Sequence, residues 1–129
     1  MENLRIAPTS ESPEIVFDYT VHRLSINGES YPENAMSFYG PVRASLEAYL
    51  AGPPPGKVVE VSCSLRYFNS SSTKLIRALV AMLNAAASTR PVILRWYHDA
   101  EDDMMMEFGM DLRDEFRIMD VQVLALETA

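Results

Sequence analysis

Cysteine is scarce in this chain of 129 residues, which has Cys63 and no other. A single cysteine cannot form an internal disulfide, and it excludes a zinc site built on paired cysteines. The lack of a disulfide framework points to a reducing compartment. Cys63 lies between serines on the expected apolar face of a strand, where a free cysteine is usually buried and inert.

Basic residues are outnumbered by acidic ones. The chain has 11 Lys and Arg against 18 Asp and Glu, a formal net charge of -7, and no basic cluster. Binding to nucleic acid requires basic surface that displaces counterions from the phosphates. The charge balance therefore disfavours nucleic acid and anionic membranes as partners.

Long apolar runs are also missing. No stretch approaches the roughly 20 apolar residues that a transmembrane helix needs, and the segment from Met1 to Arg5 lacks the apolar core of a secretory signal. We therefore expect a cytoplasmic protein. The length and the 48% of hydrophobic residues fit one ordinary globular domain. We expect residues 1–11 to be a flexible lead-in and residues 12–129 to form that single domain.

The apolar pattern predicts strands that alternate with helices. The predicted order, β-β-α-β-α-β-α-β, implies an α/β fold with a mainly parallel central sheet, an antiparallel N-terminal hairpin and helices packed on the sheet. Strands are predicted at 15–19, 23–26, 58–68, 92–97 and 121–126, with helices between Asn34 and Gly52, between Ser72 and Ser88, and from the acidic run 99–103 onward.

Several details of this pattern are testable. Thr20 to His22 should join the first two strands, and Asn27-Gly28 should form a turn. The first helix begins either at an Asn34 cap or at Gly40-Pro41. In the strand 58–68, strict alternation places Tyr67 on the same buried face as the other odd-numbered residues, and the apolar start of 92–97 predicts a central strand buried on both sides.

A run of hydroxyl residues follows the strand 58–68. In open α/β sheets, functional groups gather where strands end, and Asn69-Ser70-Ser71-Ser72 stands at such an end. One interpretation is helix capping, for which a single Asn or Ser suffices. The other is a phosphorylation switch, because a phosphoserine adds about -1.5 to -2 charge beside the positive end of the helix dipole. Positions 70–75 contain no acid, and Lys74 is available as a counter-charge.

Three motifs resemble the SiaC-like family of regulatory phosphoproteins. Tyr67-Phe68-Asn69-Ser70-Ser71-Ser72-Thr73-Lys74 resembles the family's phosphosite motif: an aromatic pair, Asn, Thr or Ser, two serines, one variable residue and Lys. Gly28-Glu29-Ser30-Tyr31-Pro32-Glu33-Asn34-Ala35 is typical of the same family. Trp96-Tyr97-His98 with the acidic run 101–103 is a weaker third match. The resemblance extends from about Ser12 to Leu126.

The resemblance implies a fold similar to anti-sigma-factor antagonist (STAS) domains and a partner-switching role. In the family a serine/threonine kinase phosphorylates the motif and a PP2C-type phosphatase reverses this. The unphosphorylated form binds and activates a diguanylate cyclase, which feeds bacterial biofilm control. The family's phospho-acceptor falls on Ser70, with Ser71 as second choice, and its neighbourhood on Asn69, Ser72 and Lys74. We expect no catalytic residue, metal or cofactor.

Partner contacts are expected close to this motif. The segment Gly28 to Asn34 is either a turn with a helix start or a docking surface that exposes Tyr31 and Glu33. The residues expected to contact a partner are Tyr31, Glu33, Asn34, Tyr67 and Phe68.

Two further groups have simpler interpretations. His98 with Asp99, Asp102 and Asp103 offers oxygen ligands for Mg²⁺, but acids are also typical of a first helical turn, which we prefer. Met104-Met105-Met106 is suited to a soft interaction surface, with at least one methionine facing the core.

Two other functions compete with the switch. A constitutive scaffold would use the serines only as caps. A small Ser or Cys enzyme would need a base from His22 or His98, and the sequence has no Gly-x-Ser-x-Gly elbow.

Overall fold

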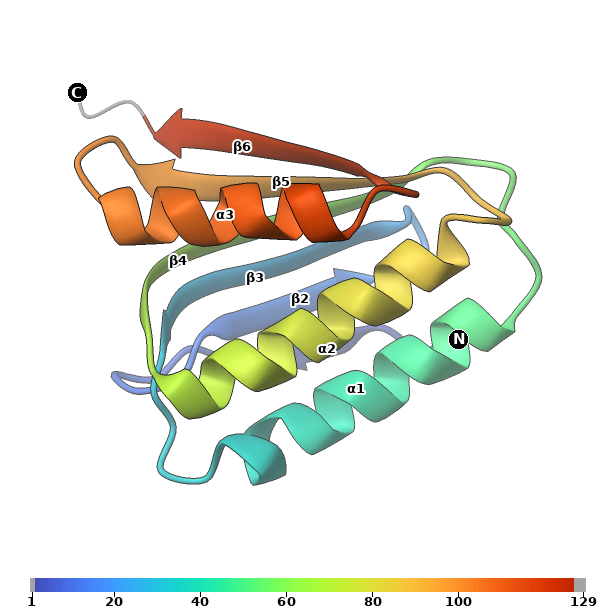
Figure 1. Cartoon of the computed structure of the whole chain (residues 1–129). Coiled ribbons are helices and arrows are strands. Elements are labelled where there is room, and N and C mark those ends of the chain that lie inside the picture. Colours follow the sequence, from blue (N-terminus) through green and yellow to red (C-terminus); the bar gives the residue numbers. More distant parts are fainter. Residues whose placement is uncertain (1, 127–129) are drawn as a thin grey trace.

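One six-stranded sheet, with its strands in chain order, forms the framework of the molecule (Figure 1). The computed structural model describes residues 2–126. The first three strands are antiparallel and the last four are parallel, so the predicted α/β class and sheet are confirmed. The elements are β1 (Leu4–Ile6), β2 (Glu14–Asp18), β3 (Arg23–Ser30), α1 (Ala35–Ala51), β4 (Val59–Phe68), α2 (Ser70–Ala86), β5 (Val92–Asp99), α3 (Asp103–Glu115) and β6 (Asp120–Leu126).

The sequence did not predict the first strand. β1 pairs antiparallel with β2, Leu4 opposite Phe17 and Ile6 opposite Ile15, and makes the order β-β-β-α-β-α-β-α-β. Three residues next to polar ones are too few for a periodic pattern to be recognised. Met1 and residues 127–129, the outer ends of the predicted lead-in and domain, lie outside the described residues.

The second and third strands form the predicted hairpin, but the predicted turn at Asn27-Gly28 is wrong. β3 continues through both residues, opposite Ser64 and Leu65 of β4. Gly28 has φ +129°, which residues with a side chain rarely adopt. Gly28 therefore lies at the register shift between β3 and β4 and does not reverse the chain.

The fourth strand contains a β-bulge at Arg66. Gly28 of β3 lies opposite Leu65, but the next residue, Glu29, lies opposite Tyr67, so Arg66 has no partner. The extra residue reverses the alternation. Tyr67 is consequently 52% exposed, which contradicts its predicted buried position, and Phe68 packs against the core in its place.

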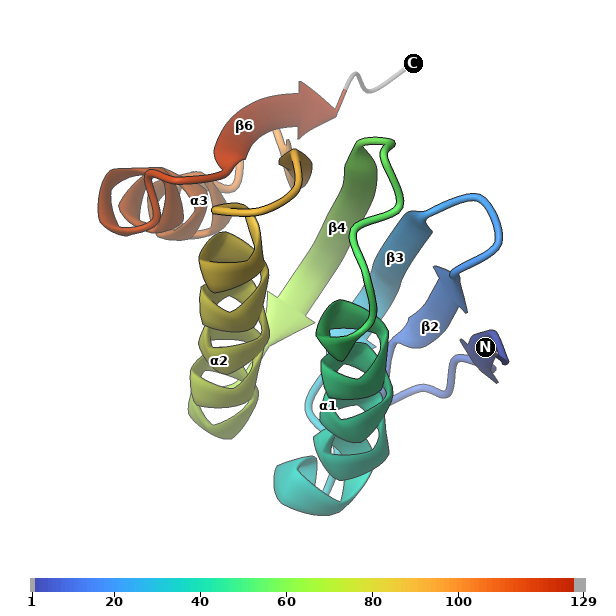
Figure 2. The same ribbon diagram turned by 90° about the vertical axis from the view of Figure 1, so that its right-hand side faces the viewer.

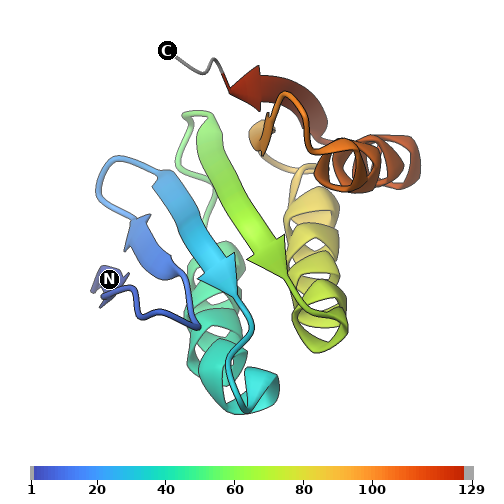
Figure 3. The same cartoon turned by 90° about the vertical axis from the view of Figure 1, so that its left-hand side faces the viewer.

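All three helices cover the same face of the sheet, as Figures 2 and 3 show from opposite sides. Helices α1 and α2 pack against each other, while α3 packs on β5 and β6. Within residues 2–126, no helix covers the opposite face (Figures 2 and 3). For this reason β5, although it has a strand on each side, alternates between buried and half-buried residues, and the prediction that it is buried on both faces is wrong.

The helices begin at side-chain caps. Asn34 Oδ1 accepts from the Ser37 N–H at 3.1 Å, so α1 begins at the Asn34 cap and continues through Pro41. Asp102 Oδ1 accepts from the Met105 N–H at 3.0 Å. Asp102 is therefore the cap of α3, and the helix begins at Asp103. The predicted start at Asp99 is wrong, because Asp99 is the last residue of β5.

Candidate functional site at the start of helix α2

The strand-to-helix junction is fixed by Asn69. Its backbone N–H donates to the Ser30 carbonyl at 3.0 Å, and its Oδ1 accepts from the Ser72 N–H at 2.9 Å. Its carbonyl accepts from the Thr73 hydroxyl at 2.9 Å. Asn69 is therefore the N-cap of α2, and the capping interpretation applies to this residue.

Ser72 is a structural residue. It is completely buried, and its hydroxyl accepts a 2.8 Å hydrogen bond from Ser30. Because that bond uses the Ser30 proton, the 2.6 Å contact between Ser30 and Tyr39 has the Tyr39 hydroxyl as donor. Burial raises the pKa of Tyr39 to about 12, so this phenol remains protonated at neutral pH.

Ser70 and Ser71 have a different environment from Ser72. Both are exposed in the first turn of α2, and within residues 2–126 neither hydroxyl takes part in a hydrogen bond. Lys74 is also exposed, one helical turn after Ser70, and forms no ion pair with a described residue. The first turn of α2 contains no acidic residue. These two serines are accessible to a modifying enzyme, whereas Ser72 is not.

Ser70 borders a hollow between the start of α2 and the start of α3, which we call the α2–α3 groove. It has a volume of about 430 Å³. Most of its lining is aromatic or methionine: the full set is Arg66, Tyr67, Phe68, Ser70, Thr73, Asp102, Met104, Met105 and Phe108. The prediction that the serine segment has no acid nearby holds along the chain but not in space, because the fold brings Asp102 into this groove.

The second predicted segment lies next to the first. Ser30, at the end of β3, is opposite Phe68, so the residues that follow each strand are neighbours. Tyr31 and Tyr67 meet edge to face with ring centroids 5.6 Å apart. Glu33 is exposed, and Asn34 is exposed but occupied as the α1 cap. The structure thus brings Tyr31 and Tyr67 together, while Phe68 points inward against Phe108 at 4.9 Å.

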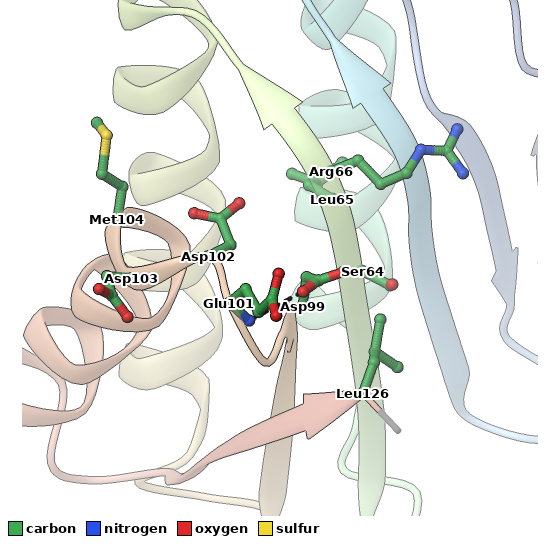
Figure 4. A pocket seen from close by; sticks show the side chains of 9 residues that line it. All are labelled: Ser64, Leu65, Arg66, Asp99, Glu101, Asp102, Asp103, Met104 and Leu126. Atoms are coloured by element: carbon green, nitrogen blue, oxygen red, sulfur yellow. Dashed lines mark hydrogen bonds between the residues drawn. The ribbon is translucent and has the colours of Figure 1, made fainter. Parts of the chain in front are cut away.

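A second, acidic hollow adjoins the groove. It has a volume of about 640 Å³ and shares Arg66, Asp102 and Met104 with the groove. Figure 4 shows its side chains, with the Arg66 guanidinium extending away from the carboxylates. The carboxylates that line this acidic hollow are Asp99, Glu101, Asp102 and Asp103. Within residues 2–126, no group of three or more His, Cys, Asp or Glu side chains has the geometry of a metal site.

The residues required by an enzyme are dispersed. Burial raises the pKa of the Cys63 thiol, which keeps it in the unreactive protonated form. His22 contacts the Tyr49 hydroxyl through Nδ1 at 2.6 Å, and His98 contacts the Asp99 carbonyl at 2.8 Å. Among the described residues, neither histidine is hydrogen-bonded to Cys63 or to a serine of the 70–72 run.

Sequence reasoning missed the residues that complete the site from other elements. Ser30 and Asp102 belong to motifs that were singled out for other reasons, and no local signal shows that they and Phe108 meet at this site. The methionine run did contain a usable signal: Met105 is buried and Met104 is 82% exposed, which confirms that the run is divided between core and surface.

Comparisons with known proteins agree with the fold and with the family that the motifs resemble. A family model for the SiaC family regulatory phosphoprotein matches residues 6–126. An uncharacterized protein of Pseudomonas aeruginosa is 35% identical over 117 residues, which cover 89% of this chain and 90% of that protein. No helix within residues 2–126 is long and apolar enough to cross a membrane.

Solved structures of proteins from the same bacterium are similar to this chain over nearly their whole length. The crystal structure of apo-SiaC from P. aeruginosa has a TM-score of 0.87 and 32% identity, covering 97% of this chain and 100% of that one. The crystal structure of the diguanylate cyclase SiaD in complex with its activator SiaC matches with a TM-score of 0.86 and 31% identity, covering 95% of this chain and 99% of that one. This chain belongs to the SiaC family of regulatory phosphoproteins.

Proposed function

We propose that this chain is a reversible binding switch, and not a catalyst, that activates a diguanylate cyclase when it is unphosphorylated. A serine/threonine kinase would transfer phosphate to Ser70 and a PP2C-type phosphatase would remove it. Family membership and the SiaC–SiaD complex of P. aeruginosa support this proposal. The observation that carries it is the position of Ser70. Its side chain is exposed, the helix is capped by Asn69 and not by Ser70, and Ser70 borders a largely apolar groove.

The location of Ser70 accommodates a phosphate without unfolding the domain. A dianion at the first residue of α2 lies beside the positive end of the helix dipole, with Lys74 one turn away. The same phosphate enters a groove lined by Tyr67 and Met104, where a strongly hydrated group opposes the docking of apolar partner atoms. Modification would thus change binding and leave the fold intact.

Accessibility ranks the three serines as phosphate acceptors. Ser70 borders the groove and is the first candidate, and Ser71 is exposed but does not line the groove, which makes it the second. Ser72 is buried and hydrogen-bonded, so a kinase would have to unfold the first turn of α2 to reach it. The partner surface that we propose includes Tyr31, Glu33 and Tyr67, together with Asn34, which is exposed as the α1 cap, and Phe68, which packs against Phe108.

The first test is intact-mass and fragment mass spectrometry of the protein from its own cells. One phosphate on Ser70 supports the proposal, and one on Ser71 moves the switch by a residue. A protein that is unmodified under all growth conditions, including overproduction of its kinase, contradicts it.

The second test measures cyclase activation in those cells by the level of cyclic di-GMP. Ser70→Ala should keep the level high constitutively, and Ser70→Glu should reduce it to that of a deletion strain. Ser88→Glu, an exposed serine beyond the opposite end of α2, is the matched control and should behave like the wild type. Equal levels for all three variants would overturn the switch.

A further inference from the structure

The α2–α3 groove has a floor of packed aromatic rings and a border of exposed side chains. Phe108 packs against Phe68 with centroids 4.9 Å apart and against Trp96 at 5.2 Å, which fixes the aromatic floor. The border is formed by Met104, 82% exposed, and Tyr67, 52% exposed. A hollow of about 430 Å³ with this lining accommodates an apolar side chain, and methionine adapts to its shape.

Uncompensated negative charge lies directly beside this apolar groove. The adjoining acidic hollow is lined by Asp99, Glu101, Asp102 and Asp103, and none of these carboxylates forms an ion pair within residues 2–126. Asp99 and Asp102 only accept backbone N–H groups, from Glu101 and Met105. The hollows share Arg66, Asp102 and Met104, so a partner that fills one is within reach of the other.

We propose that the groove receives an apolar side chain of the partner, and that a Lys or Arg next to it in the partner's structure enters the acidic hollow. The inference rests on the proposed function and specifies the chemistry of the partner's contact. Apolar burial supplies the affinity, and the four carboxylates select a basic segment over an acidic one. A phosphate on Ser70 blocks the apolar part of this site.

Cross-linking in the native cells locates the contact. Met104 is replaced by benzoylphenylalanine in the full chain, and Ile118, an exposed apolar residue between α3 and β6, is replaced in a matched control. Fragment mass spectrometry then identifies the partner residue joined to each position. We expect the Met104 position to join an apolar residue that has Lys or Arg within one helical turn, and the Ile118 position to join no such segment.

The outcomes separate this inference from the proposed function. A diguanylate cyclase joined at Met104 through an apolar and basic segment supports both. A cyclase joined only at Ile118, or joined at Met104 through a segment without a basic residue, overturns the groove and leaves the switch. A protein without a cyclase domain, joined at Met104 through such a segment, supports the groove and overturns the cyclase. No partner at either position overturns the groove.

Affinity measurements give the second readout. A synthetic peptide of the joined segment is titrated against the full chain. Met104→Glu should weaken binding about tenfold or more, since it removes apolar burial, while Ile118→Glu should have no effect. Replacing the peptide's Lys or Arg by Glu should also weaken binding. This loss of affinity should be larger at low salt than at high salt, because salt screens the interaction with the four carboxylates. A salt-independent affinity would contradict the role of the four carboxylates.

Discussion

The hydroxyl of Ser30 donates a 2.8 Å hydrogen bond to the hydroxyl of Ser72, 42 residues further along the chain. Since Tyr39 donates to Ser30 in turn, three hydroxyls connect α1, the end of β3 and the first turn of α2. All three residues are buried. The turn that presents Ser70 is therefore positioned from within the core.

Ser72→Ala tests this connection. The variant leaves the Ser30 hydroxyl without its acceptor in a buried position, which should lower the free energy of unfolding by about 1–3 kcal/mol. Ser71→Ala, the exposed neighbour, should change it by less than about 0.5 kcal/mol. Urea denaturation of both variants provides the measurement. Equal stabilities would show that the hydroxyl chain contributes nothing to the fold.

Tyr39 should make the protein sensitive to alkaline pH. Its pKa is about 12 in the fold, raised by burial from 10.0, so its protonated form favours folding. The contribution is fully present below pH 10 and is lost as pH rises toward 12, up to about 3 kcal/mol. Urea denaturation at a series of alkaline pH values should show a shallower loss for Tyr39→Phe than for wild type. Parallel curves would contradict the prediction.

Gly109→Ala should displace α3. A Cβ at this position would lie 2.4 Å from Trp96 Cδ1, and the indole cannot move aside easily because its Nε1 donates to the Met105 carbonyl at 2.9 Å. Overpacking of this kind costs about 1–3 kcal/mol. Asp111→Ala, an exposed site on the same helix, is the control and should be nearly neutral. Thermal unfolding measures the loss of stability, and the fluorescence of Trp96 reports the displacement of α3. An unchanged fluorescence spectrum would contradict the displacement.

Ser70→Asp should not destabilise the domain. A negative charge at the first residue of α2 interacts favourably with the helix dipole, which predicts a gain of about 0.3–1 kcal/mol at low ionic strength. Ala85→Asp, near the other end of the same helix, should have the opposite sign. Both effects should shrink in high salt. If Ser70→Asp unfolds the protein at low salt, phosphorylation at this position cannot be a purely surface event.

Local signals in the sequence predicted the parts of the site that depend on neighbouring residues. Asn and Ser are preferred caps, so Asn34 was one of two predicted starts of the first helix and the run that begins at Asn69 was a predicted cap for the second; the structure shows that Asn34 and Asn69 are the caps. The strand-helix order follows from apolar periodicity in the same way. The three-residue β1 was missed, because its pairing with β2 and not its own pattern makes it a strand.

Other features depend on contacts between distant residues. Nothing near Ser30 indicates that it meets Ser72, and nothing near Asp102 indicates that it shares a groove with Ser70. Gly28 looked like half of a turn because the Asn-Gly dipeptide tolerates the positive φ that such turns require, yet in the structure it lies within a strand at φ +129°. These features required the register of the sheet, which single-residue preferences do not determine.

The β-bulge at Arg66 decides which aromatic ring beside Ser70 is exposed. If β4 paired with β3 without this bulge, strict alternation of the same residues would turn Tyr67 into the core and Phe68 outward. The surface chemistry beside Ser70 therefore depends on the bulge as much as on the identity of the residues in β4. A change that shifts the pairing of β4 with β3 by one residue is therefore expected to alter this surface more than a substitution within it does.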